Sequence, residues 1–506
     1  MRVLLMYKDR DFKESELPKN SEDLISDLGI DVIFDHMSKG DQYVFDISKE
    51  VLLNPLVDKE TIIYRQEIMR DALENPEIIR SLYEMTIEVE ESKREKWWGI
   101  FGWKTPSNIL SGARRTLESL LYFLKKLRKV ADENSDKFRS EGFRNFFEMI
   151  KTELSDEYLQ RAEEMVEKLK FQKGILLRVS IGEGNEGKDY TLIKPLEKKW
   201  FRRILKRQKV YSYKLNPRDE AGAQALDEIR NKGISEVTNV VACAADHIES
   251  FFKKLRKEIA FYVGAINLQE SMKDLEIPIT FPRVTDEKQI SFKNLVNISL
   301  ALTNGKKKVI GNDLKEIGKS LFIVTGANRG GKTTFLRSFG QAILMMQSGM
   351  FVSAKDFSSN LYSGVFTHFR REEDESMRMG KFEEELSRMS IIVDQIRPGA
   401  LLLLNEFLSS TNEREGSEIA HQIVRALVEN GISVMYVTHM YTLARKFFGC
   451  KNALFLRAER TPDGKRTFKI KEGEPLPTSF GGDIYKKLFG EEIDGLEKER
   501  EGCAPL

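Results

Sequence analysis

The segment Leu321–Thr334, LFIVTGANRGGKTT, decides the fold of the C-terminal half of the chain. It opens with an apolar run that predicts a buried strand, and the next residues, 334–346, have the apolar spacing of a helix. Between strand and helix, Gly326–Thr333 satisfies the pattern G-x-x-x-x-G-K-[ST], whose glycines allow successive backbone N–H groups to surround phosphate oxygens. This order of strand, glycine-rich loop and helix predicts a site for a nucleoside triphosphate.

The pattern gives each loop residue a predicted role. Lys332 would bridge the β- and γ-phosphates, and the hydroxyl of Thr333 would bind Mg²⁺. The N-terminus of the following helix adds the positive end of its dipole. The predicted cofactors are therefore ATP and Mg²⁺. The loop residues expected to hold the nucleotide are Gly326, Gly330, Gly331, Lys332 and Thr333.

A second apolar run, residues 401–407 (LLLLNEF), ends in the polar pair Asn405-Glu406. P-loop ATPases usually carry Asp and then Glu at these two positions, and the Glu can deprotonate the attacking water. Glu406 is the predicted general base. Asn405 can still accept from a metal-bound water but lacks the charge that favours Mg²⁺, which predicts weaker Mg²⁺ binding or slower turnover. The alternative is that the pair merely ends a strand.

A third run, residues 433–440 (SVMYVTHM), ends in Thr438-His439. A lone His at a strand end is more often structural, but after the two preceding motifs His439 is expected to contact the γ-phosphate or the attacking water. The predicted catalytic group is Lys332, Glu406 and His439. The other histidines lack such a context and are expected to be structural or surface residues; they are His36, His247, His368 and His421.

Composition limits the other possibilities. The 506 residues include 81 Lys+Arg and 79 Asp+Glu, a net charge of +2, so any nucleic-acid surface must be a local patch. A hydrophobic content of 41% excludes a largely disordered chain. Apolar runs are too short to span a bilayer, the N-terminus has no signal-peptide pattern, and three scattered cysteines form no disulfide or metal framework. A cytoplasmic protein without a membrane partner is expected.

One such patch is the basic run from Lys198 to Lys209, KKWFRRILKRQK. Its cations could pair with phosphates while Trp200 stacks on an unpaired base. The alternative is a solvated amphipathic helix with its apolar side chains facing a core. The candidate DNA contacts are Lys198, Lys199, Trp200, Arg202, Arg203, Lys206 and Arg207. The tryptophans at 97, 98 and 103 favour a core or an oligomer interface.

The C-terminal half resembles the ATPase domain of MutS-type mismatch-repair proteins, which are relatives of the ABC ATPases. The segments that carry the resemblance are, in chain order, Val309–Asp313 (VIGND), Thr325–Thr334 (TGANRGGKTT), Phe382–Leu386 (FEEEL), Asn405–Gly416 (NEFLSSTNEREG), Thr438-His439 and Ser479–Gly481 (SFG). The resemblance adds Asn328 and Thr334 to the nucleotide-binding loop and implies that Ile310 and Asn312 help to hold the base. The N-terminal part resembles the family's core and lever domains more faintly, over 27–34 and 64–76.

The expected fold is therefore an α/β P-loop (ABC-like) ATPase domain at the C-terminus, preceded by a mainly α-helical core/lever region with a small β-hairpin insertion. The expected boundaries are a helical region 1–172, a β-hairpin and basic segment 173–215, lever-like helices 216–285 and the ATPase domain 286–506. The hairpin is predicted from two β-like runs around Gly182, Gly184 and Gly187.

Three departures from the family pattern qualify this expectation. Core-like sequence begins before residue 35, which leaves no room for a mismatch-reading domain. Gly380 stands where the family has a Ser that helps to complete the partner's ATP site, with Ser376 nearby but out of register. The third departure is Asn405. Together they predict DNA binding without classical mismatch reading, and slow hydrolysis.

The resemblance implies a DNA-binding ATPase that forms a homodimer through its ATPase domains, with Leu408–Glu415 at the interface. ATP would drive a lever or clamp movement on a DNA structure. The alternative is an ATP-gated scaffold that hydrolyses slowly or not at all and binds a protein partner. No L-S-G-G-Q string supports a transporter subunit, and no long heptad pattern supports a chromosome-structuring ATPase.

Overall fold

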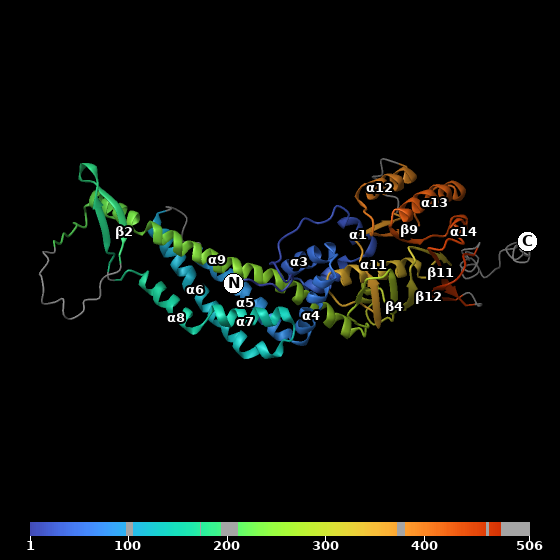
Figure 1. The fold of residues 1–506 in the computed structure, drawn as a ribbon, viewed down its shortest axis with the longest axis horizontal. Helices are drawn as coiled ribbons and strands as arrows, with labels where there is room; N and C mark the ends of the chain where they lie inside the picture. Colours follow the sequence, from blue (N-terminus) through green and yellow to red (C-terminus); the bar gives the residue numbers. More distant parts are fainter. Residues whose placement is uncertain (98–104, 173, 194–210, 372–379, 462–464, 477–506) are drawn as a thin grey trace, which may run out of the picture. The chain divides into compact units, whose positions relative to one another are not determined.

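The computed structural model describes residues 1–97, 105–172, 174–193, 211–371, 380–461 and 465–476. The chain divides into two compact units (Figure 1). One contains residues 1–5 and 77–259, and the other contains residues 6–76 and 260–506. None of the described helices is long and apolar enough to cross a membrane.

The first unit is mainly helical. Its helices are α5 (Pro76–Trp97), α6 (Pro106–Asn134), α7 (Glu141–Glu153), α8 (Asp156–Lys168) and the part of α9 (Glu220–Asp274) up to Ile259. Ser140 and Ser155 cap α7 and α8 by accepting hydrogen bonds from backbone N–H groups of the first helical turn. Apolar residues at helical spacing are buried, as the sequence predicts, including Phe143 and Phe147 beside Phe138.

The β-hairpin predicted for this unit is confirmed. Strands β1 (Leu177–Ile181) and β2 (Gly187–Leu192) pair antiparallel, with Ile181 opposite Gly187. Gly184 has a φ of 69° in the connecting turn, a conformation that glycine adopts at little cost.

The second unit contains a mainly parallel sheet. In the described residues its order is β12-β11-β6-β10-β9-β8, and only β12 runs antiparallel to its neighbour. The strands are β6 (Leu321–Gly326), β8 (Val365–Phe369), β9 (Leu401–Asn405), β10 (Ser433–Val437), β11 (Ala453–Arg460) and β12 (Arg466–Glu472). The three predicted strands are thus confirmed as β6, β9 and β10, and β10 lies between the other two.

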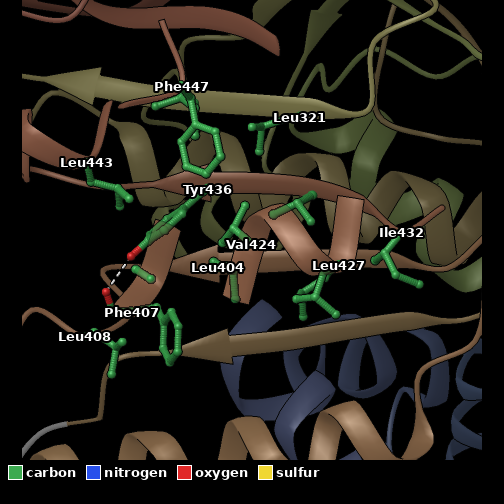
Figure 2. Packing of buried hydrophobic residues seen from close by; sticks show 14 of the residues in the cluster. Leu321, Leu404, Phe407, Leu408, Val424, Leu427, Ile432, Tyr436, Leu443 and Phe447 are labelled. Carbon is green, nitrogen blue, oxygen red and sulfur yellow. Dashed lines mark hydrogen bonds between the residues drawn. The ribbon is translucent and has the colours of Figure 1, made fainter. Parts of the chain in front are cut away.

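Successive side chains of a strand point to opposite faces of the sheet, so the apolar strands here present apolar side chains on both faces. Helices cover both of these faces. Leu402 and Leu404 belong to a buried cluster with residues of α12 (Lys381–Gln395) and α13 (Glu413–Glu429). Figure 2 shows Leu404 in this cluster beside Val424 and Tyr436. On the other face, a Cβ added at Gly340 of α11 (Lys332–Gln347) would lie 2.8 Å from Leu403, so α11 packs closely there.

The remaining elements complete the second unit. A four-stranded sheet has the order β3-β7-β4-β5. Its strands are β3 (Arg283–Thr285), β4 (Gln289–Leu295), β5 (Asn312–Ile317) and β7 (Asp356–Asn360). The other helices are α1 (Ser21–Leu28), α2 (Asp31–Ser38), α3 (Gln42–Leu53), α4 (Lys59–Glu74), α10 (Ile298–Asn304), α14 (Tyr441–Lys446) and the end of α9.

The compact units do not follow the predicted boundaries. Residues 6–76, expected to belong to the helical region 1–172, pack instead with the C-terminal sheet. Hydrogen bonds explain this, since Arg337 and Gln341 of α11 donate to the backbone carbonyls of Asp27 and Leu28 in α1, at 2.7 and 2.8 Å. The lever-like segment expected at 216–285 is the single helix α9, followed by β3.

Candidate active site

The loop between β6 and α11 requires its glycines. Gly326 and Gly331 have φ values of 107° and 90°, which side chains disfavour. A Cβ at Gly330 would lie 2.7 Å from the carbonyl oxygen of Ala327, so the chain could not turn this tightly with another residue there. The loop ends at the first turn of α11, where backbone N–H groups without helical partners favour an anion. The geometry therefore fits the predicted phosphate loop.

Lys332 is the first residue of α11 and its side chain is buried. Its Nζ donates to the carbonyl oxygens of Gly326 at 3.0 Å and Ala327 at 3.2 Å, so the ammonium lies within the loop. Burial lowers the pKa of Lys332, while the negative charge of Glu406 opposes that shift. A buried cation that donates to neutral carbonyls can exchange them for phosphate oxygens, which form stronger charge-assisted hydrogen bonds.

Thr333 and Asn405 connect the phosphate loop to the end of β9. The hydroxyl of Thr333 donates to Oδ1 of Asn405 at 3.0 Å. These two oxygens fit a Mg²⁺ ion that is held mainly by phosphates and water, as Mg²⁺ usually is at nucleotide sites. Neither oxygen carries a charge. Among the described residues, no group of three or more His, Cys, Asp or Glu side chains could hold a metal ion by itself.

Glu406 begins the loop after β9 and has a φ of 56°. Its N–H donates to the carbonyl of Val437 at 2.8 Å, which fixes the residue beside the end of β10. Its Oε1 lies 3.7 Å from Nδ1 of His439. His439 is the main cause of a lowered pKa for Glu406, with smaller contributions from Lys332 and Arg370 against the effect of burial. Glu406 is therefore ionised at neutral pH and able to accept a proton.

The sequence pointed to no role for Arg370, which lies beside this pair. Arg370 directly follows β8, and its N–H donates to the carbonyl of Asn405 at 3.0 Å. Its guanidinium Nη1 lies 3.9 Å from Oε2 of Glu406. The two oxygens of Glu406 therefore face different neighbours, His439 beyond β10 and Arg370 beyond β8. Its position follows from the parallel pairing of β8 with β9, which a single sequence does not reveal.

Two buried contacts hold the loop after Glu406. Oε2 of Glu385 accepts from the N–H of Leu408 at 2.7 Å, and the hydroxyl of Tyr436 donates to the carbonyl of Phe407 at 2.5 Å (Figure 2). Leu408 has a φ of 57°, an uncommon conformation for a leucine. The sequence gives Glu385 no role beyond its place in the FEEEL segment, and it gives Tyr436 none beyond its place in the strand run 433–440.

Of the residues expected at the base, Asn312 is the first residue of β5, and its side chain bonds to the backbone of β12. Oδ1 of Asn312 accepts from the N–H of Ile470 at 2.7 Å, and its Nδ2 donates to the carbonyl of Phe468 at 3.4 Å. A Cβ at Gly331 would lie 3.6 Å from Phe468, so this pair of strands adjoins the phosphate loop. Ile310 is half-buried in the segment before β5.

The other predicted residues divide into three groups. Asn328 is exposed, with its carbonyl accepting from Arg466 at 3.4 Å, and Thr334 lies in α11 with its carbonyl accepting from Asn297. His368 is buried as a structural residue, and burial together with the nearby Arg388 lowers its pKa to about 3. The predicted features outside the described residues are the basic run 198–209, Trp98, Trp103, Ser376 and Ser479–Gly481.

Known proteins resemble both parts of the chain. Residues 57–275 match the family model described as MutS2 N-terminal domain, and residues 322–481 match the one described as MutS domain V. Endonuclease MutS2 of Carboxydothermus hydrogenoformans is 28% identical over 252 residues, which are 49% of this chain and 31% of that protein. DNA mismatch repair protein MutS of Persephonella marina is 24% identical over 489 residues, 83% of this chain and 52% of that protein.

DNA mismatch repair protein MutS of Petrotoga mobilis is 22% identical over 508 residues, 90% of this chain and 60% of that protein. The chain thus spans between about a third and three fifths of the length of these relatives. The two family models together cover most of the chain. The chain therefore belongs to the MutS-related family.

Proposed function

We propose that this chain is a MutS-type DNA-binding ATPase with an ABC-like P-loop domain. The observation that carries the proposal is the meeting of three groups at one edge of the parallel sheet. They are the buried Lys332, the Thr333–Asn405 pair and the ionised Glu406 beside His439. Each matches a part that phosphoryl transfer needs: a cation for the phosphates, oxygens toward a metal ion, and a proton acceptor.

In the proposed reaction, Lys332 exchanges its two carbonyl contacts for oxygens of the β- and γ-phosphates. Water attacks the γ-phosphorus and the bond to the β–γ bridging oxygen breaks, which gives ADP and inorganic phosphate. Glu406 takes the proton released by the water, and His439 orients the Glu406 carboxylate. Bound Mg²⁺ supplies charge neutralisation on the phosphates, with Thr333 and Asn405 as the residues that would face it.

The proposed mechanical step couples this site to DNA. Residues Asn412 to Glu415 are exposed just before and within the start of α13, which suits the expected contact between two ATPase domains. The helix α9 contributes residues to both compact units and is the proposed lever. Tyr211 and Tyr213, which follow the basic run 198–209 in the sequence, are 75% and 92% exposed, and exposed aromatics of this kind can stack on unpaired bases.

A second candidate function rests on the neutral Thr333–Asn405 pair. Without a carboxylate there, the chain would bind ATP, hydrolyse it very slowly and act as an ATP-gated scaffold for a protein partner. Gly380 at the N-cap of α12 supports the same alternative, since it lacks the Ser hydroxyl expected for the partner's ATP site.

Steady-state ATP hydrolysis with and without branched, mismatched and single-stranded DNA, at two salt concentrations, separates the two functions. Stimulation by one DNA structure, weakened by salt, supports the DNA-coupled ATPase. A near-zero rate that DNA does not change, with ATP still bound, supports the scaffold. In both cases Lys332→Ala should weaken ATP binding by about 10-fold or more, because a charged hydrogen-bond donor to phosphate is lost.

A further inference from the structure

We propose that Arg370 is a nucleotide-binding residue that contacts the γ-phosphate, and that its charge replaces part of the charge that Mg²⁺ usually supplies. This chain should therefore bind ATP with only weak dependence on Mg²⁺ and should prefer ATP to ADP through Arg370. The inference rests on the proposed function, because it takes Glu406 to mark the γ-phosphate end of the site.

The backbone holds Arg370 at that end. Strands β8 and β9 pair in parallel with Phe369 opposite Asn405, and the N–H of Arg370 donates to the carbonyl of Asn405. The pairing thus continues past the end of β8 and places Arg370 next to Asn405 and Glu406. Because this contact is made by the main chain, the backbone of Arg370 stays beside Asn405 whatever rotamer its side chain adopts.

The side chain is turned toward the site and is weakly held. Its Nη1 lies 3.9 Å from Oε2 of Glu406, which is an ion pair beyond hydrogen-bonding distance. The side chain is 39% exposed, and such pairs add little to stability. A guanidinium in this state can turn to a phosphate oxygen, with which Arg forms two parallel charge-assisted hydrogen bonds.

Arg371, the next residue, makes a useful contrast. Its guanidinium pairs with Asp23 of α1, so its charge is directed away from Glu406. Two adjacent arginines with the same charge thus have different partners, and the chain supplies its own matched control.

The charges around the phosphate loop favour a nucleoside triphosphate without bound Mg²⁺. Among the described residues, the cations that act on Lys332 or Glu406 include Arg370 and Arg466, while position 405 supplies a neutral amide. A carboxylate at 405 would attract Mg²⁺ but repel a bare triphosphate. Asn405 removes that repulsion, and Arg370 adds a positive charge at the end of β8, which is separated from β6 and its phosphate loop by β10 and β9.

The test is calorimetric titration of the full chain with ATP and with ADP, each in Mg²⁺ and in EDTA. The variants are Arg370→Gln, Arg371→Gln and Lys332→Ala, and the Tm of each shows that it is folded. Wild type should bind ATP in EDTA within about 10-fold of its affinity in Mg²⁺. Arg370→Gln should weaken ATP binding in EDTA by about 10-fold or more, through loss of charged hydrogen bonds, and change ADP binding by less than about twofold.

Arg371→Gln should leave all four affinities unchanged. The proposal is overturned if Arg370→Gln binds ATP in EDTA as wild type does, or loses ATP and ADP affinity equally. It is also overturned if wild type needs Mg²⁺ to bind ATP at all. Lys332→Ala separates this failure from a wider one: if it too binds ATP normally, the nucleotide site itself is wrongly placed and the proposed function fails.

Discussion

Glu385 and Leu408 are joined by a buried hydrogen bond of 2.7 Å, in which the carboxylate of α12 accepts the N–H of a residue two positions beyond Glu406. Both Glu406 and Leu408 have positive φ values, so the loop after β9 departs from the usual backbone conformations of these residues. Such conformations persist only where the surroundings hold them. Glu385 is therefore a positioning residue for Glu406.

Replacing Glu385 should lower kcat more than it affects nucleotide binding. Glu385→Ala leaves the buried N–H of Leu408 without its acceptor, at a cost of about 1–3 kcal/mol. A shift of roughly 1 Å in Glu406 would lower kcat about 100-fold, while ATP affinity changes by less than about threefold. Glu385→Gln keeps an acceptor oxygen and should restore most of kcat. Glu383→Gln, on the exposed side of α12, is the matched control. An equal loss in both Glu385 variants would contradict a positioning role.

His439 should set the acidic limit of activity. It is the main cause of the lowered pKa of Glu406, so the base stays ionised below the usual pH range of a glutamate. In His439→Ala that pKa rises, and the acidic limb of the kcat/KM profile against pH moves to higher pH. His247→Ala, an exposed histidine of α9, should leave the limb in place. If the limb of His439→Ala coincides with that of wild type, Glu406 is not the group that titrates.

Asp27 should make stability fall as pH rises. Burial raises its pKa to about 6 from 3.8, although its carboxylate accepts the N–H of Phe369 at 3.2 Å. Between those values the folded state keeps a proton that the unfolded state releases, so stability is fully present below the lower value and is lost as pH approaches the upper one. The loss is about 3 kcal/mol, from the difference of the two pKa values.

Urea unfolding of wild type and Asp27→Asn at several pH values between 4 and 7 measures this effect. Relative to wild type, Asp27→Asn should gain stability with rising pH, because the neutral amide has no proton to lose. Asp35→Asn, at an exposed position of α2, is the matched control for removal of a carboxylate. A difference between Asp27→Asn and wild type that does not change with pH would show that burial does not raise the pKa of Asp27 in the folded state.

Local sequence patterns predict the strands and the phosphate loop of this site. They do not predict contacts between segments that are distant in the sequence. The residue types of the run LFIVTG favour a buried strand, and the glycines after it permit a tight turn. The sequence alone therefore predicts β6 and the phosphate loop. Arg370 reaches Glu406 because β8 pairs with β9, and Asp27 joins the C-terminal sheet through contacts with α11, Thr367 and Phe369. A single sequence contains no record of such pairings, so the packing of residues 6–76 with the C-terminal sheet does not follow from local patterns.

The basic run 198–209 predicts a steep salt dependence of DNA binding. Neutralising four of its cations should weaken binding to single-stranded and branched DNA and reduce the slope of log affinity against log salt by about 3. The substitutions are Arg202→Gln, Arg203→Gln, Lys206→Gln and Arg207→Gln. A control removes four exposed charges from α6 and α8 and should leave the slope unchanged; its substitutions are Lys125→Gln, Lys129→Gln, Arg161→Gln and Lys168→Gln. Identical isotherms for both variants would favour the amphipathic-helix interpretation of the run.

Asn405→Asp should increase Mg²⁺-dependent turnover. The carboxylate would still accept a hydrogen bond from the hydroxyl of Thr333, and it would add the negative charge that attracts a divalent cation. The half-saturating Mg²⁺ concentration for ATP hydrolysis should fall by about 10-fold, which corresponds to about 1.4 kcal/mol. ATP binding in EDTA should weaken at the same time, because the new charge repels a bare triphosphate. Asn108→Asp adds the same charge in the first turn of α6 and should change neither quantity. If Asn405→Asp leaves the Mg²⁺ dependence unaltered, the amide already serves the metal as well as a carboxylate would, and the charge at this position does not limit hydrolysis.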